Sequence, residues 1–108
     1  MKMRWLLAVA LFSLVFALVL PPMAAAQSAM DTYKAKCAMC HGADGKGDTA
    51  MGKKMGLKDF SSADVQSKSD ADLNGIITNG KAPMPGYKGK LTDAQIDSLV
   101  KYIRSLKK

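Results

Sequence analysis

The two cysteines and the only histidine of the chain stand together in one short motif, Cys37-Ala38-Met39-Cys40-His41. On a helix, residues three positions apart share a face, so Cys37 and Cys40 can present their sulfur atoms on the same side. His41 follows directly and adds an imidazole at the same place. Any chemistry that depends on thiols or imidazole is therefore confined to this motif, and the fold must be built around it.

The C-x-x-C-H spacing is typical of c-type haem attachment. In this interpretation each thiol forms a thioether with one vinyl group, and His41 binds the iron from the proximal side. Three interpretations compete with it. Cys37 and Cys40 could form a disulfide in an oxidising compartment. They could form a thioredoxin-like redox pair, which needs a βαβ context that the flanking sequence lacks. A structural zinc site needs a second pair of ligands, and the chain has no other Cys or His. We predict one haem c, with its iron, per chain.

The second axial position of such an iron calls for another ligand, and histidine or methionine is usual. The methionines beyond residue 26 are Met30, Met39, Met51, Met55 and Met84. Met39 lies inside the attachment motif and cannot cross the ring, and Met30 precedes it on the same helix. Met84 stands between two prolines, which restrict the backbone and exclude helix and central strand. A methionine can also fill a gap in a core, but a polar loop is a poor place for that. We predict Met84 as the ligand, with Met55 next.

The first 26 residues have the order of a secretory signal peptide. Lys2 and Arg4 precede a run of sixteen uncharged residues, Trp5–Leu20, and a small-residue cleavage site ends at Ala26. We expect residues 1–26 to be removed and residues 27–108 to form one domain in the periplasm. The alternative is an uncleaved membrane anchor, although sixteen residues are short against the roughly 20 that a spanning helix needs.

Size and composition limit what residues 27–108 can build. A domain this small rarely gains enough stability from its own side chains, and it usually recruits a metal, a cofactor or a disulfide. Its aromatic residues are Tyr33, Phe60, Tyr87 and Tyr102. The length excludes a multidomain enzyme, and two cysteines exclude a disulfide-dense scaffold.

Helix signals recur along the domain, and no segment has a convincing strand pattern. Ser28 is expected to cap a helix over Ala29–Cys40, and Ser69 a helix that ends at Asn79 before Gly80. Between them, residues 42–60 are expected to form a loop with a short helical turn. In that loop Leu57 and Phe60 are apolar anchors for the haem or the core.

The clearest local signature lies near the C-terminus. Thr92 and Gln95 form a capping box, which predicts a helix from there to Leu106. Its buried face is expected to carry Ile96, Leu99, Val100, Ile103 and Leu106, at helical spacing.

On these motifs, nearly all of residues 28–108 resemble a class I c-type cytochrome of the small bacterial kind. The resemblance rests on the haem motif, the glycine-rich loop at 42–47, the methionine loop Gly80–Tyr87 and the Leu91–Leu106 helix. It implies an all-α cytochrome c fold, with roughly three to five helices around one covalently bound haem. It also implies that the first and last helices cross near the haem, where Tyr33 and Cys37 would meet Leu99 and Tyr102.

The chain departs from this family in two places. Many members have a proline after the haem motif, whose carbonyl orients the axial histidine, and here no proline occurs between Pro22 and Pro83. Many members also have a tryptophan at a haem propionate, and residues 27–108 have none. Tyr87 is the candidate for that role, and the acceptor for His41 is open.

With His41 and Met84 both bound, the iron has no open site. We therefore expect a one-electron carrier of the periplasm, not an enzyme, with no catalytic residues, no small-molecule substrate and no nucleic acid partner. One alternative is a subunit or tethered electron-entry domain of a larger oxidoreductase or terminal oxidase. A less favoured one is a haem sensor or peroxidase-like protein with a labile methionine ligand.

The basic balance of the chain suggests how a redox protein partner could dock. The formal net charge is +7. Lysines flank both predicted haem loops, at Lys53, Lys54, Lys58, Lys81, Lys88 and Lys90. If these lysines ring the haem edge, they would steer an acidic patch of a partner toward it. The alternative is ordinary surface charge. We expect the chain to be a monomer.

Overall fold

The structure is a computed structural model, and it describes residues 22–108. Six helices follow one another: α2 (Pro22–Lys36), α3 (Ala38–His41), α4 (Ala50–Met55), α5 (Ala63–Gln66), α6 (Asp70–Asn79) and α7 (Asp93–Ser105). No strand occurs in this range, where isolated β-bridges join Lys81 to Met84 and Lys88 to Leu91. The prediction of an all-α fold is confirmed. Most of the predicted signal peptide, residues 1–21, lies outside the described residues.

The first predicted helix differs from the observed structure at its start and in its continuity. α2 begins at Pro22 and not after Ser28, because proline suits the first helical position and the alanines that follow favour helix. The helix also stops at Lys36. Cys37 has φ −117° and ψ −35°, and it precedes the separate short helix α3. The two cysteines therefore lie at either end of one tight turn.

The prediction for α6 is confirmed, and that for α7 is confirmed except at Leu106, which follows the end of the helix and is only half-buried. Ser69 caps α6 by accepting a hydrogen bond from the backbone N–H of Asp72 at 3.0 Å. Thr92 and Gln95 form both hydrogen bonds of the capping box at the start of α7. The core contains four of the predicted α7 residues, Ile96, Leu99, Val100 and Ile103, together with Tyr33, Val65, Leu73 and Ile77.

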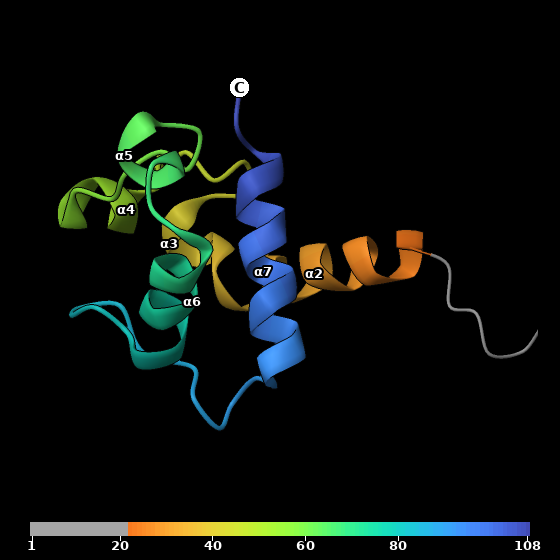
Figure 1. The fold of residues 1–108 in the computed structure, drawn as a ribbon. Helices are drawn as coiled ribbons and strands as arrows, with labels where there is room; N and C mark the ends of the chain where they lie inside the picture. Colours follow the sequence, from red (N-terminus) through yellow and green to blue (C-terminus); the bar gives the residue numbers. More distant parts are fainter. Residues whose placement is uncertain (1–21) are drawn as a thin grey trace, which may run out of the picture.

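The other helices pack on two sides of α7. Figure 1 shows α2 crossing behind α7, while α4, α5 and α6 lie on one side of α7. At the crossing, the rings of Tyr33 and Tyr102 lie with centroids 5.0 Å apart, as the resemblance to class I c-type cytochromes implies for the first and last helices. α6 packs against α7 as well, through a core that includes Leu73 and Ile77. These contacts fix the walls between which the haem motif and the methionine loop meet.

Candidate haem-binding site

One cavity of about 410 Å³ brings together all the predicted site residues. Cys37, Cys40 and His41 line it, and so does Met84 from the loop after α6. The other walls are mainly apolar and include Leu57, Phe60, Val65, Leu73, Ile76, Ile77, Leu99 and Ile103. A volume in the range of about 300–1,000 Å³ is usual for a cofactor site. The fold therefore joins two motifs that are far apart in the sequence.

The cavity separates the five candidate methionines into two groups. Met55 and Met84 line it. The other three do not line it and are exposed, Met30 to 40%, Met39 to 84% and Met51 to 47%. Only Met55 and Met84 of these five therefore have access to a group bound in the cavity, which agrees with the ranking from the sequence.

The methionine loop folds back onto the end of α6. The backbone groups of Lys81 and Met84 are hydrogen-bonded to each other in both directions, at 2.8 and 3.2 Å. After the loop, the N–H of Tyr87 donates to the carbonyl of Ile77 at 2.9 Å. Gly86 allows this close approach, because a Cβ there would lie 2.6 Å from the backbone of Asn79. The loop that holds Met84 is thus tied down at both of its ends.

The backbone of the haem motif is held by hydrogen bonds from three directions. The Tyr33 hydroxyl donates to the carbonyl of Gly42 at 2.7 Å, and the Thr49 hydroxyl donates to the carbonyl of Cys40 at 2.7 Å. The N–H of Gly47 donates to the carbonyl of His41 at 2.7 Å. Because these partners come from α2 and from the loop after α3, the motif is a fixed part of the cavity wall.

His41 is positioned by stacking and not by a hydrogen bond. Its ring stacks on the ring of Phe60, with centroids 4.6 Å apart and planes at 28°. Its Nδ1 atom is buried and has no hydrogen-bond partner within residues 22–108. Burial lowers the pKa of the imidazole, which keeps the ring neutral, as a metal ligand must be. In many class I c-type cytochromes a proline carbonyl accepts this hydrogen bond from the axial histidine. Within residues 22–108, no other carbonyl takes its place.

The two cysteines are free thiols, and the environment of Cys37 does not favour a thiolate. Burial, and then the charge of Cys40, raise the pKa of the Cys37 thiol to about 11. Reactive redox pairs have a lowered pKa, because the thiolate is the nucleophile. Cys37 therefore does not resemble the attacking thiol of a thioredoxin-like pair.

Four lysines line the cavity, and no acidic residue does. They are Lys36, Lys58, Lys68 and Lys81. Only two of these, Lys58 and Lys81, belong to the predicted ring of lysines. Of the other predicted members, Lys53 pairs with Asp48 at 3.1 Å, and none of the remaining three lines the cavity. Lys36 and Lys68 have no spacing signal in the sequence, because tertiary packing alone places them here.

Tyr87, the candidate for a propionate contact, lines the cavity but has another hydrogen-bond partner. Its hydroxyl donates to the backbone carbonyl of Lys36 at 3.1 Å. Burial raises the pKa of this hydroxyl, so it stays protonated. In the structure Tyr87 joins the methionine loop to the end of α2.

The residues of the cavity fit a covalently bound haem. An apolar space has two thiols at its wall, together with a half-buried imidazole whose Nδ1 atom is buried and has no partner within residues 22–108. Met55 and Met84, each with a thioether sulfur, line the same cavity. Lysines in the lining can balance the negative charge of the haem propionates. This donor set matches the axial ligands that iron takes in haem proteins of the His/Met type.

Comparisons with known proteins agree with this description. A family model described as "Cytochrome C oxidase, cbb3-type, subunit III" matches residues 24–103. The chain is 36% identical over 85 residues to "Cbb3-type cytochrome c oxidase subunit CcoP" of Azospirillum brasilense, covering 77% of this chain but 29% of that protein. It is 36% identical over 96 residues to "Cytochrome c6" of Rippkaea orientalis, covering 82% of this chain and 79% of that one.

A solved structure, "KustC0563 c-type cytochrome", superposes with a TM-score of 0.68 at 34% identity. The match covers 74% of this chain and 98% of that chain. Sequence and structure comparisons thus point to the same family as the haem motif, the helices and the cavity. The chain belongs to the cytochrome c family, and it is a small class I c-type cytochrome with covalently bound haem c.

Proposed function

We propose that His41 and Met84 bind the haem iron on its two faces, and that the chain carries single electrons between redox proteins. The observation that supports this is the one cavity lined by both thiols, His41 and Met84. In this arrangement Cys37 and Cys40 anchor the haem through thioethers. The protein is a monohaem electron carrier of the cytochrome c family.

The haem supplies a one-electron change between ferric and ferrous iron. The chain's own residues allow this change to take place without a change in ligation. With haem bound, His41 and Met84 would hold the iron and leave no place for a substrate, so we propose a carrier and not an enzyme. Apolar side chains such as Leu73 and Ile77 exclude water from the cavity. Such a dry environment favours the oxidation state of the haem that carries less charge. Because no ligand has to move, electron transfer needs little rearrangement.

The lysines at the cavity suit an acidic redox partner. Lys36, Lys58, Lys68 and Lys81 line the space with positive charge, of which Lys58 is paired with Asp64 at 3.6 Å. A positive rim around a haem edge raises the rate of encounter with a negative patch. We propose that the partner docks over this rim and that the carrier acts as a monomer.

We also propose that the protein works outside the cytoplasm. The first 26 residues have the features of a signal peptide, and a haem bound by thioethers cannot be lost to an open compartment. Within residues 22–108, none of the helices has the length and apolar character that crossing a bilayer requires. Sequencing the N-terminus of the protein purified from a periplasmic fraction tests this proposal, and a sequence that starts at Met1 contradicts cleavage.

The axial ligand is tested by Met84→Ala, with Met55→Ala as the matched control from the same cavity. The wild-type protein is matured in a host with haem-attachment machinery. It is expected to show a sharp α-band when reduced and a weak sulfur-to-iron charge-transfer band at the red end of the ferric spectrum. M84A is expected to lose the weak band, and M55A to keep it. If M55A loses the band and M84A keeps it, Met55 is the ligand.

One comparison favours a second candidate function. The similarity to the CcoP subunit suggests an electron-entry domain that feeds a larger oxidase. Purification of the protein from its own membranes and soluble fraction distinguishes the two. Elution with a larger haem protein complex supports the subunit, and elution alone supports the carrier. Carbon monoxide binding by the reduced protein at neutral pH would instead favour the sensor or peroxidase-like alternative, because it requires an open axial position.

A further inference from the structure

His41 has an unusual environment for a metal ligand. A ligating histidine almost always donates its second ring N–H to a carboxylate, a carbonyl or water, which fixes the ring and raises its basicity. Here Nδ1 is buried and has no such acceptor within residues 22–108. The contact that does fix the ring is the stacked Phe60, 4.6 Å away. Phe60 therefore covers a face of the imidazole, while the edge at Nδ1 has no acceptor among residues 22–108.

Phe60 is itself held at both of its backbone polar groups. Its N–H donates to the carbonyl of Gly45 at 2.9 Å, and its carbonyl accepts from the side-chain amide of Gln66 at 2.7 Å. The ring is confined as well. Tyr33 meets it edge-on at 6.2 Å, and a Cβ on Gly45 would lie 2.9 Å from the ring. A side chain so constrained can hold its neighbour in one orientation.

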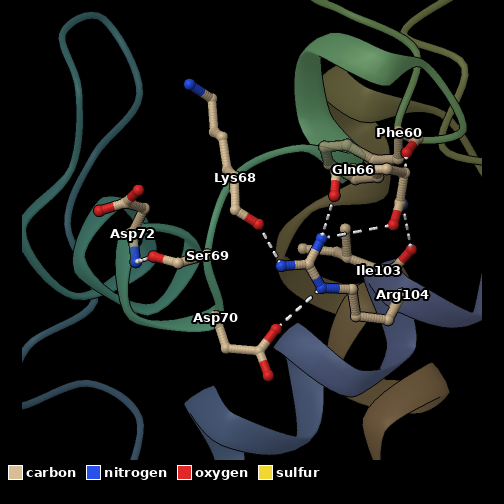
Figure 2. Close-up of polar contacts among 8 residues, drawn as sticks. All are labelled: Phe60, Gln66, Lys68, Ser69, Asp70, Asp72, Ile103 and Arg104. Atoms are coloured by element: carbon tan, nitrogen blue, oxygen red, sulfur yellow. Dashed lines mark hydrogen bonds and ion pairs between the residues drawn. The ribbon is translucent and has the colours of Figure 1, made fainter.

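The amide of Gln66 is oriented by Arg104, as Figure 2 shows. Nη1 of Arg104 donates to the backbone carbonyl of Gln66 at 2.9 Å and to its Oε1 at 3.4 Å. Since the oxygen faces the guanidinium, Nε2 must face the carbonyls of Phe60 and Ile103. Arg104 is fixed in turn by Asp70, whose carboxylate accepts from Nε at 2.8 Å, and by the carbonyl of Lys68. A polar network from α7 thus ends at the carbonyl of Phe60.

We infer that Phe60 is the positioning residue of His41, with Gln66 and Arg104 holding Phe60 in place, and that its ring keeps water from Nδ1. The inference rests on the proposed role of His41 as an axial ligand. An Nδ1–H without an acceptor leaves the imidazole a weaker electron donor than a hydrogen-bonded one. A weaker donor stabilises the ferric form less, so this packing holds the reduction potential up.

The test uses Phe60→Leu in the haem-loaded protein, with two readouts. Leucine lacks the flat ring, so water gains access to Nδ1 and accepts its hydrogen. Because the chain has a single histidine, isotopically labelled histidine gives NMR signals from His41 alone. In the ferrous wild type we expect a resolved Nδ1–H signal, protected from exchange. In F60L we expect that signal to be lost through exchange with water, and the reduction potential to fall.

Three further variants separate positioning from general stability. Phe60→Tyr keeps an aromatic ring and is expected to keep the Nδ1–H signal and the potential. Gln66→Leu keeps the ring of Phe60 but removes the hydrogen-bond donor to its carbonyl. It is expected to weaken the Nδ1–H signal and lower the reduction potential, both by less than F60L does. Tyr102→Leu makes the same kind of change one ring further away, since Tyr102 contacts Tyr33 and does not line the cavity. It is expected to leave both readouts unchanged.

The outcomes are distinguishable. An unchanged Nδ1–H signal and potential in folded F60L and Q66L overturn the inference and leave the axial role of His41 intact. Equal effects of Y102L and F60L overturn it too, because loss of packing in general would then explain the result. If Nε2 of the wild-type histidine shows no sign of bound iron, the proposed function itself fails at His41.

Discussion

Gly52 shows how a single residue can hold the haem motif and α4 together. It lies within α4, where a Cβ would be 2.2 Å from the carbonyl oxygen of Gly47 and 2.7 Å from that of Cys40. Thr49 completes the junction, because its hydroxyl accepts from the N–H of Gly52 at 2.8 Å and donates to the carbonyl of Cys40. No side chain fits between these backbones, so glycine is required here by close approach.

Gly52→Ala is therefore expected to lower the free energy of unfolding by about 1–3 kcal/mol, because backbone atoms must move apart. It is also expected to lower the yield of attached haem, since Cys40 moves with its carbonyl. Gly75→Ala is the matched control. Gly75 lies within α6, where a Cβ would meet nothing within 4 Å, so this change should raise stability by about 0.4–1 kcal/mol. Denaturant unfolding measures both, and equal effects would contradict the close-approach argument.

α7 combines a strong local start signal with a buried face. Its capping box satisfies backbone groups at its first turn, while Ile96 and Leu99 are almost completely buried against the other helices. Its far end supplies Arg104 to the network that reaches Phe60. The capping box and the contacts of Arg104 thus lie at opposite ends of α7. The cap can therefore be weakened without a direct effect on the network that reaches Phe60.

Thr92→Ala is expected to lower the free energy of unfolding by about 1 kcal/mol, because one cap hydrogen bond is lost. The absorption spectrum and the reduction potential should not change, since Thr92 does not line the cavity. Thr92→Ser keeps the hydroxyl and is expected to retain most of the stability. Thermal unfolding followed by circular dichroism checks this, and a shifted potential in T92A would show that the cap acts on the haem site.

At the scale of the whole molecule, four lysines line the cavity, and in the proposed function they would meet a redox partner. Lys68 lies at the cavity, and Figure 2 shows its side chain extending away from Arg104. Lys101 is also exposed, but it lies on α7 and does not line the cavity. These two lysines differ mainly in their position, which makes them a matched pair.

The rate of electron transfer to an acidic redox protein is expected to fall as ionic strength rises, because salt screens the attraction. Lys68→Gln should lower the rate at low salt and flatten this dependence, while Lys101→Gln should have a smaller effect. Stopped-flow kinetics over a series of salt concentrations measures the rates. A rate that is insensitive to salt would mean that the lysines are ordinary surface charge.

Much of the fold follows from signals that lie within a few residues of one another. The C-x-x-C-H spacing predicts haem attachment, and the capping box and apolar period predict α7 in nearly its observed extent. The local order around Met84 also singles it out, although its binding to iron stays a prediction. Such features depend on backbone geometry, helix caps and residue spacing, all of which are set by residues close together in the sequence.

Contacts between distant segments could not be predicted in this way. The break at Cys37, the stacking of Phe60 on His41 and the lysines Lys36 and Lys68 at the cavity all depend on how the helices pack. Likewise, Met51 and Met55 are four residues apart, yet one is exposed and the other lines the cavity. The sequence by itself therefore determined the cofactor and the helices with clear local signals, α6 and α7. Only the tertiary structure decided which side chains surround the site, because packing brings together residues that no local pattern relates.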